Sequence, residues 1–240
     1  MTGTVRRDEL TANLAAVRTR IERACDAAGR DPAEVTLIVV TKYFPVSDVL
    51  LLHDLGVRDF GENRDQEAGP KFGEARSELR RRGGDDLTLH FIGQLQSNKA
   101  GHVAAYADVV QSVDRSKLVG ALSRGADHAG RPLAVLLQVS LDGDTARGGV
   151  LPEHALELAD EVVAHDALTL KGVMAVAPLG AAPDESFRRL RDVADGIRSQ
   201  HVDADWISAG MSGDLEAAVL NGATHLRVGT AILGSRPSLL

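Results

Sequence analysis

Hydrophobic residues at the start of the chain recur every three or four positions, the spacing that places side chains on one face of an α-helix. Between Arg6 and Gly29 this face consists of Leu10, Leu14, Val17, Ile21 and Ala24. Gly29 and Pro32 follow, and both residue types commonly end helices. The pattern therefore predicts a helix within residues 1–30.

The hydrophobic pattern then changes to short continuous runs. The run from Val35 to Lys42 is rich in β-branched residues and almost wholly apolar before its lysine, which is typical of a parallel strand covered on both faces. Seven more runs follow at residues 57–62, 87–93, 107–113, 132–140, 168–177, 204–208 and 224–229. Segments with helical spacing separate them, among them residues 152–165 and 184–200.

Eight strands that alternate with helices over about 200 residues favour a closed parallel barrel, the (β/α)8 TIM barrel of the α/β class. A flavodoxin-like or Rossmann sheet is the alternative, but no G-x-G-x-x-G motif follows the first strand, and eight units exceed what those folds need. The chain has no linker or low-complexity break, so we expect one domain over residues 1–240, with the helix of residues 1–30 packed outside the barrel.

Composition narrows the classes of protein that remain. A net charge of −7 without a basic stripe argues against nucleic-acid binding. Cys25 is the single cysteine, so no internal disulfide can form, and the eight histidines are scattered, so we expect no metal site. The chain shows neither an apolar signal segment nor a run of about 18 apolar residues. We therefore expect a cytoplasmic protein without membrane contact.

Lys42 is the first candidate for chemistry, because ligand sites of such barrels lie at the carboxyl ends of the strands. A neutral lysine amine is a nucleophile that forms an imine with an aldehyde. The alternative is a surface lysine that extends from the strand end into solvent. The chain has five lysines beside 22 arginines, so it uses arginine where a plain surface cation suffices. This bias favours a chemical role for Lys42.

Glycines and hydroxyl side chains follow the last two predicted strands. They belong to a set formed by Ser208, Gly210, Met211 and Ser212 after the seventh strand and Gly229 and Thr230 after the eighth. Backbone amides at glycines and at a helix amino terminus, here expected near Gly213, attract phosphate, and this is the commonest phosphate position on a barrel. The alternative is an ordinary turn with Ser212 as the helix N-cap. Asp214 supports that alternative, because its carboxylate would repel a phosphate.

Arg227 lies two residues before Gly229 in the eighth predicted strand, so both residues occupy the same side of the strand. A guanidinium is permanently protonated and can only donate hydrogen bonds. If the ligand carries a pyridine ring, Arg227 would donate to the ring nitrogen and leave it unprotonated. Such a ring would be a weak electron sink.

Six motifs in this order resemble those of a known family. They are VVTKYFP, FGENRDQE, LHFIGQLQSNKA, GVMAVAP, ISAGMSGDLEAAV and LRVGTAILG, and they cover nearly the whole chain. The chain thus resembles the pyridoxal 5′-phosphate homeostasis proteins, single-domain relatives of the alanine racemase barrel. The resemblance implies a pyridoxal phosphate cofactor held as an internal aldimine on Lys42.

The resemblance also implies roles for the other residues. The phosphate would be held by Ser208, Gly210, Met211, Ser212, Gly229 and Thr230. Arg227 would face the pyridine nitrogen, and Asn63, in the motif FGEN, would lie near the ring. The implied function is to hold and deliver the cofactor within the cell, with apo forms of pyridoxal phosphate enzymes as recipients.

An amino-acid racemase is the alternative function. Racemisation needs a base on each face of the substrate, and racemases of this fold type supply one as a tyrosine from an additional domain that we expect this chain to lack. Tyr43 would point away from Lys42 in an extended strand, and Tyr106 would end an outer helix. His90 is expected to be a strand histidine with satisfied hydrogen bonds rather than a catalyst. We therefore expect a monomeric carrier with little or no turnover.

Overall fold

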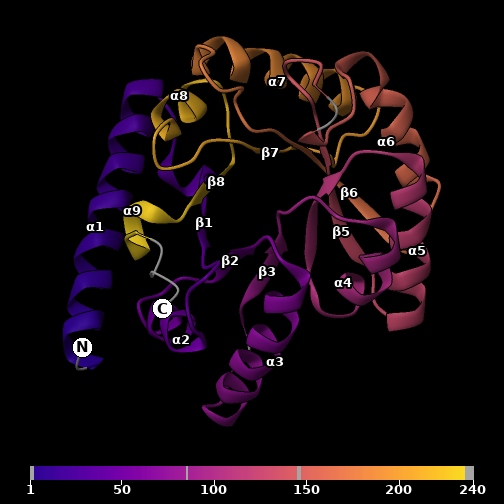
Figure 1. Cartoon of the computed structure of the whole chain (residues 1–240). Coiled ribbons are helices and arrows are strands. Elements are labelled where there is room, and N and C mark those ends of the chain that lie inside the picture. Colours follow the sequence, from indigo (N-terminus) through magenta and orange to yellow (C-terminus); the bar gives the residue numbers. More distant parts are fainter. Residues whose placement is uncertain (1–2, 85, 145–146, 236–240) are drawn as a thin grey trace.

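Eight parallel strands close into a barrel in the computed structural model, which describes residues 3–84, 86–144 and 147–235. The strands pair in chain order, and β8 pairs with β1 to close the ring (Figure 1). Their bounds are β1 Thr36–Val40, β2 Asp59–Glu62, β3 Thr88–Phe91, β4 Val109–Val113, β5 Leu133–Gln138, β6 Leu168–Met174, β7 Trp206–Ser208 and β8 His225–Val228. The predicted barrel is confirmed, and each predicted strand is present.

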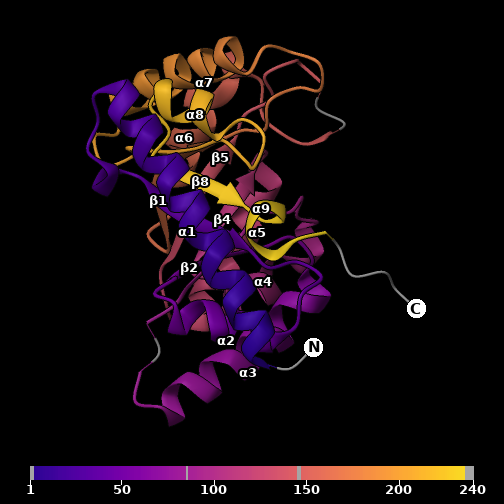
Figure 2. The same ribbon diagram turned by 90° about the vertical axis from the view of Figure 1, so that its left-hand side faces the viewer.

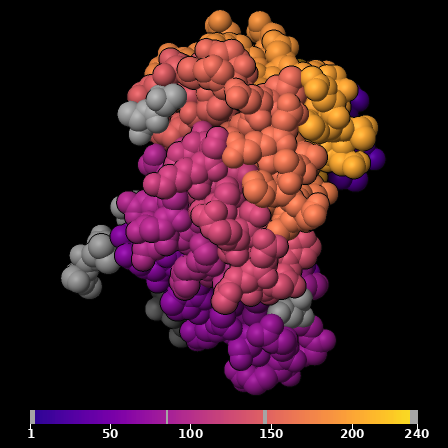
Figure 3. Space-filling model, turned by 90° about the vertical axis from the view of Figure 1, so that its right-hand side faces the viewer, coloured from indigo at the N-terminus to yellow at the C-terminus, as the bar shows by residue number. Residues whose placement is uncertain are grey.

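Helices form the outer layer around these strands. Their bounds are α1 Gly3–Ala28, α2 Val46–Asp54, α3 Asp65–Arg81, α4 Ala100–Tyr106, α5 Ser116–Ala129, α6 Ala155–Val163, α7 Pro183–Arg198, α8 Leu215–Leu220 and α9 Thr230–Leu233, with short 3₁₀ turns η1 Pro32–Glu34, η2 Ser97–Lys99 and η4 Pro152–His154. On the face opposite α1, the chain from α3 (magenta) to α7 (orange) makes up a continuous surface (Figure 3). No described helix has the length and apolarity needed to cross a membrane.

The amino-terminal helix α1 crosses the outside of the barrel and packs against α8 and α9 (Figure 2). The five residues of its predicted apolar face are all buried. Its polar face is also used: Asn13 Nδ2 donates to the carbonyl oxygen of Ile232 at 3.0 Å, and Arg20 Nη2 donates to that of Ser212 at 3.1 Å. Helix α1 therefore braces the chain segments that follow β7 and β8.

The inside of the barrel is divided into an apolar and a polar part. Val109, Leu136 and Met174 form a small apolar cluster of their own, separate from the main core between strands and helices. The polar part consists of buried side chains on β3, β4, β7 and β8, namely His90, Gln111, Ser208, His225 and Arg227. Barrel interiors are usually filled by branched apolar side chains, so buried polar groups here need partners among themselves.

His225 lies deep in this polar part. Its ring stacks on Trp206 with a centroid distance of 4.1 Å, and its Nδ1 contacts Thr224 Oγ1 at 2.8 Å. Burial is the largest of the causes that lower the pKa of His225 from 6.5 to about 3. The ring is therefore neutral in the folded protein at neutral pH.

The first prediction concerns Gly172, which follows a register shift between β5 and β6 and has φ +145°. A Cβ atom there would lie 1.9 Å from the carbonyl oxygen of Trp206. Gly172→Ala should lower the free energy of unfolding by roughly 3 kcal/mol or more, because backbone strain adds to overpacking. Urea unfolding measures this loss.

Gly196 in α7 is the matched control, because a Cβ atom there meets nothing within 4 Å. Gly196→Ala should stabilise the protein by about 0.5–1 kcal/mol. Equal effects of the two substitutions would show that the contact with Trp206 is not the reason Gly172 is needed.

The second prediction follows from the lowered pKa of His225. The unfolded chain binds a proton below about pH 6.5, whereas folded His225 does so only near pH 3. As the pH is lowered from about 6.5 to about 3, the free energy of unfolding should therefore fall by roughly 1.4 kcal/mol per pH unit because of this group. In His225→Phe, which keeps a ring on Trp206, that slope should become smaller, while exposed His128→Gln should retain it. Identical slopes in wild type and His225→Phe would contradict the assignment.

Candidate functional site

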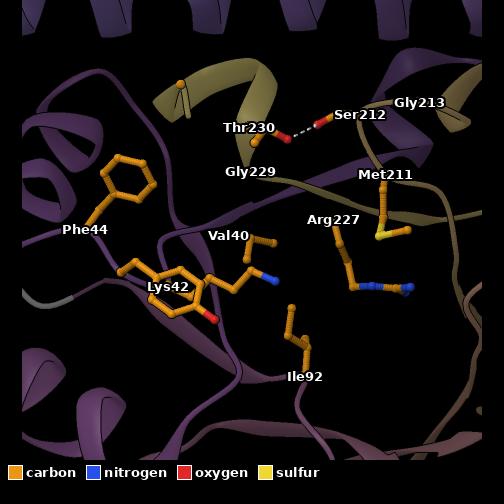
Figure 4. A pocket seen from close by; sticks show the side chains of 12 residues that line it. Val40, Lys42, Phe44, Ile92, Met211, Ser212, Gly213, Arg227, Gly229 and Thr230 are labelled. Atoms are coloured by element: carbon orange, nitrogen blue, oxygen red, sulfur yellow. Dashed lines mark hydrogen bonds between the residues drawn. The ribbon is translucent and has the colours of Figure 1, made fainter. Parts of the chain in front are cut away.

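A cavity of about 460 Å³ opens at the carboxyl ends of the strands. Figure 4 shows side chains that point into it from the ends of β1 and β3 and from the segments after β7 and β8. Six of the nine residues proposed from the sequence line it: Lys42, Met211, Ser212, Arg227, Gly229 and Thr230. The other lining residues are Val40, Tyr43, Phe44, Ile92, Gly213 and Gly234. Barrel closure thus brings most of the predicted site together.

Lys42 lies in a tight turn rather than in a strand. Strand β1 ends at Val40, and the Phe44 amide donates to the carbonyl oxygen of Thr41 at 3.0 Å, so Lys42 and Tyr43 are the two central residues of the turn. The strand predicted as far as Lys42 is therefore too long at this end. Within the cavity, the Lys42 amine points into the space bordered by Ile92 and Arg227 (Figure 4).

Tyr43 is the one described non-glycine residue with positive φ, at +71°. The prediction that Tyr43 points away from Lys42 is wrong, because it assumed an extended backbone, and the turn brings Tyr43 into the lining of the same cavity. The left-handed conformation costs a non-glycine residue about 1–2 kcal/mol, and such strain is typical of functional sites. The guanidinium of Arg64 lies 6.0 Å from the centre of the Tyr43 ring.

A buried ion pair supports this turn from behind. Lys71 Nζ on α3 lies 2.7 Å from Glu62 Oε1 at the end of β2. Thr41 Oγ1 donates to the same carboxylate at 2.8 Å, and Lys71 Nζ donates to the Thr41 carbonyl oxygen at 3.0 Å. Burial raises the pKa of Glu62, and Lys71 acts against this rise. The hydroxyl and the carbonyl oxygen of Thr41, which directly precedes Lys42, are thus anchored. Sequence reasoning missed Lys71, because no motif marked its position on α3.

Two hydroxyl groups meet where the segments after β7 and β8 approach each other. Ser212 Oγ lies 3.4 Å from Thr230 Oγ1 and accepts from the amide of Ala231 at 3.3 Å, and Figure 4 marks the contact between the hydroxyls. With the backbones of Gly213 and Gly229 beside them, they form a small polar cradle. Such an arrangement of hydroxyls and amides suits an anion.

The alternative role of Ser212 as a helix N-cap is wrong. Helix α8 begins at Leu215, and its N-cap position belongs to Asp214, which makes no side-chain capping bond. Instead Asp214 Oδ1 accepts from the Met211 amide at 2.6 Å. The carboxylate thereby closes the turn around Ser212 and uses up the Met211 amide, so Met211 contributes its side chain to the cavity.

Arg227 reaches the cavity from inside the barrel, and only 4% of the residue is exposed. Its Nη1 donates to Ser208 Oγ at 2.7 Å and its Nη2 to the carbonyl oxygen of Ala175 at 2.8 Å. Burial lowers the pKa of Arg227 to about 10, and Asp214 opposes this effect. The guanidinium therefore stays protonated at neutral pH and remains a donor.

Three residues proposed from the sequence are not among the described residues that line the cavity. Ser208 is fully buried, and its hydroxyl already bonds Arg227 and Gln111. Gly210 has φ +87°, and a Cβ atom there would lie 2.5 Å from Ala218 Cβ, so it serves a tight turn. Asn63 follows β2, and its buried Oδ1 has no hydrogen-bond partner in the part of the chain that the structure describes.

The residues around the cavity fit an aromatic aldehyde that carries a phosphate group. The Lys42 amine can react with an aldehyde, and the Ser212 and Thr230 hydroxyls suit a phosphate. Arg227 can donate to a ring nitrogen, and Val40 and Ile92 supply apolar walls for a flat ring. Within the described ranges, no three histidine, cysteine or carboxylate side chains gather as metal ligands.

Comparison with known proteins agrees with this chemistry. The profile of the alanine racemase N-terminal domain matches residues 11–237. A pyridoxal phosphate homeostasis protein of Mycobacterium tuberculosis is 44% identical to this chain, and the match covers 96% of this chain and 94% of the relative. The pyridoxal phosphate homeostasis protein of Escherichia coli is 35% identical, and the match covers 95% of this chain and 97% of the relative. PipY of Synechococcus elongatus, solved with pyridoxal phosphate bound, is 33% identical with a TM-score of 0.79, over 94% of this chain and 100% of PipY. The chain therefore belongs to the family of pyridoxal phosphate homeostasis proteins, which is built on the alanine racemase N-terminal domain.

Proposed function

We propose that this protein binds pyridoxal 5′-phosphate through an imine on Lys42 and serves the homeostasis and delivery of that cofactor. The observation that carries the proposal is the meeting of three groups in one cavity: the Lys42 amine, the Ser212 and Thr230 hydroxyls, and the Arg227 guanidinium. Relatives named for this function and the pyridoxal phosphate in PipY support it.

Each group has a defined task in this proposal. The cofactor supplies an aldehyde, which condenses with a primary amine and releases water. The turn at Thr41 holds the Lys42 amine at the cavity, and the Ser212 and Thr230 hydroxyls hold the phosphate. Arg227, with a pKa of about 10, donates to the ring nitrogen and keeps it unprotonated. An unprotonated ring withdraws electrons weakly, which supports little or no turnover.

The position of the cradle also supports a carrier. Gly213 and Thr230 are exposed, and 39% of Met211 is exposed. A phosphate held there lies at the edge of the barrel mouth rather than in its depth, so the cofactor can be exchanged with other proteins. In this proposal the chain acts as a single cytoplasmic domain and monomer, and apo forms of pyridoxal phosphate enzymes receive the cofactor.

Amino-acid racemisation is the second candidate function, and one observation favours it. Tyr43 lines the same cavity as Lys42, so a phenol and an amine border one ligand space, as a reaction with two bases requires. Tyr106, in contrast, ends α4 and donates to Asp65 Oδ1 at 3.1 Å, and burial raises the pKa of its phenol. Tyr43 is thus the tyrosine whose effect on turnover separates the two functions.

The third prediction tests the lysine. Wild-type protein mixed with pyridoxal phosphate should gain a visible absorption band, and borohydride should then fix the cofactor on Lys42, as located by peptide mass spectrometry. Lys42→Ala should lose the band and retain its circular dichroism, because the imine needs the amine but the barrel does not. Lys99→Ala, which alters an exposed lysine, should behave like wild type. A label on a different lysine would show the assignment to be wrong.

The fourth prediction tests turnover. Loaded wild-type protein should racemise alanine and other amino acids at well below about 1 per second, the lower end of ordinary enzyme rates. Any residual rate should be equal in Tyr43→Phe and Tyr106→Phe. A rate above about 1 per second that falls in Tyr43→Phe alone would replace the carrier by the racemase.

A further inference from the structure

A line of hydrogen bonds crosses the barrel interior from Arg227 to Asp59. Arg227 Nη1 donates to Ser208 Oγ at 2.7 Å, and Ser208 Oγ donates to Gln111 Oε1 at 2.7 Å. Gln111 Nε2 then lies 3.0 Å from His90 Nδ1, and His90 Nε2 lies 3.0 Å from Asp59 Oδ1. Five strands, β8, β7, β4, β3 and β2, each contribute one residue. The line therefore joins the ligand cavity to the opposite part of the barrel.

The two ends of this line determine the direction of every bond in it. A guanidinium can only donate, and a carboxylate can only accept. Ser208 must therefore accept from Arg227 and pass its single proton to Gln111, and the Gln111 amide must then donate to His90. It follows that His90 is a neutral imidazole with its proton on Nε2, directed at Asp59. The expectation that His90 has satisfied hydrogen bonds is confirmed on both ring nitrogens.

The middle of the line has no contact with solvent. Ser208, Gln111 and His90 are each 0% exposed, whereas the Asp59 side chain is 26% exposed. A buried polar group that loses its partner costs about 1–3 kcal/mol, and each of these side chains serves two neighbours at once. The loss of any member therefore disturbs the next one, so the bonds form or break together.

The line of hydrogen bonds affects the cavity because its first bond holds the Arg227 guanidinium, which lines the cavity. Among the described residues no carboxylate pairs with the Arg227 guanidinium. Its hydrogen bonds there go to the hydroxyl of Ser208 and the carbonyl oxygen of Ala175. Neutral acceptors restrain a guanidinium without neutralising it. Two of its five N–H donors are used in this way, which sets the plane of the group and leaves its charge directed at the cavity.

We propose that Ser208, Gln111, His90 and Asp59 are positioning residues that aim the Arg227 guanidinium at the ring nitrogen of the bound cofactor. This inference rests on the proposed function and adds residues that do not touch the cofactor. Without the line, the guanidinium can rotate about its long side chain, and the ring nitrogen loses its fixed donor. Weaker binding and a changed electronic spectrum follow from that loss.

The fifth prediction compares a break in the middle of the line with a change at its end. Arg227→Glu offers the ring nitrogen a carboxyl group in place of a donor that never releases its proton, and it should shift the visible absorption band of bound pyridoxal phosphate. Gln111→Met, which can neither donate nor accept through an amide, weakens donation to the ring nitrogen without protonating it, so it should shift the band in the direction opposite to Arg227→Glu. It should also raise the dissociation constant by about tenfold, as expected for one charge-assisted hydrogen bond. In the double variant the two shifts should not add.

Asp59 allows the test to be made without changing any residue near the cavity. Asp59→Ala removes the final acceptor and should shift the band as Gln111→Met does, whereas Asp59→Asn keeps an acceptor oxygen and should restore the wild-type spectrum. Met174→Leu is the matched control, because Met174 is buried in the apolar part of the interior and takes no part in the line. It should leave both the spectrum and the affinity unchanged.

A second readout needs no cofactor. Nitrogen NMR of the histidine rings should find His90 protonated on Nε2 in the wild type, with the Nδ1 signal altered in Gln111→Met. A normal imine on Lys42 together with an unchanged spectrum and affinity in Gln111→Met would overturn the positioning role and leave the proposed function intact. Failure of wild-type protein to take up pyridoxal phosphate would overturn both. Should Gln111→Met not fold, Ser208→Ala provides the same comparison with a smaller change.

Discussion

Parallel pairing of β1 with β8 closes the barrel and thereby builds the candidate site. It places Ile38 opposite Arg227 and Val39 opposite Val228, and it joins the first strand of the chain to the last. The turn that carries Lys42 thereby comes to lie beside the segments with Ser212 and Thr230. Such closure between distant parts of a chain has a high entropic cost, and helix α1 helps to offset it by bonding to backbone carbonyls on both of those segments.

Two buried cations near the cavity are accommodated in different ways. Lys71 forms a direct ion pair with Glu62, and this pair holds the backbone from which Lys42 projects. Arg227 is held by neutral groups instead. An ion pair would satisfy a buried charge more directly, but it would also cancel the field that Arg227 directs into the cavity. The ion pair thus holds the backbone before Lys42, and the neutral acceptors leave the Arg227 charge without a paired carboxylate beside the cavity.

The turn at Lys42 and Tyr43 links the geometry of the site to both candidate functions. Positive φ at a tyrosine is unfavourable, yet it lets the chain leave β1 sharply with both side chains bordering the cavity. The same turn would serve a carrier, by presenting the amine, and a racemase, by adding a phenol. The two candidate functions differ in whether the Tyr43 phenol takes part in turnover.

Sequence patterns alone predict the eight strands, the closed barrel, the outer position of α1 and six of the residues around the cavity. These follow from local hydrophobic spacing and from the rule that strand ends in a barrel share one face. The folded structure reveals that Ser208 bonds Arg227 instead of lining the cavity, that Lys71 anchors Thr41, and that Tyr43 borders the cavity. The physical reason is that strand periodicity specifies a side of the sheet but not a partner. Partners such as Gln111 for Ser208 come from other strands, and they meet only after the barrel has closed.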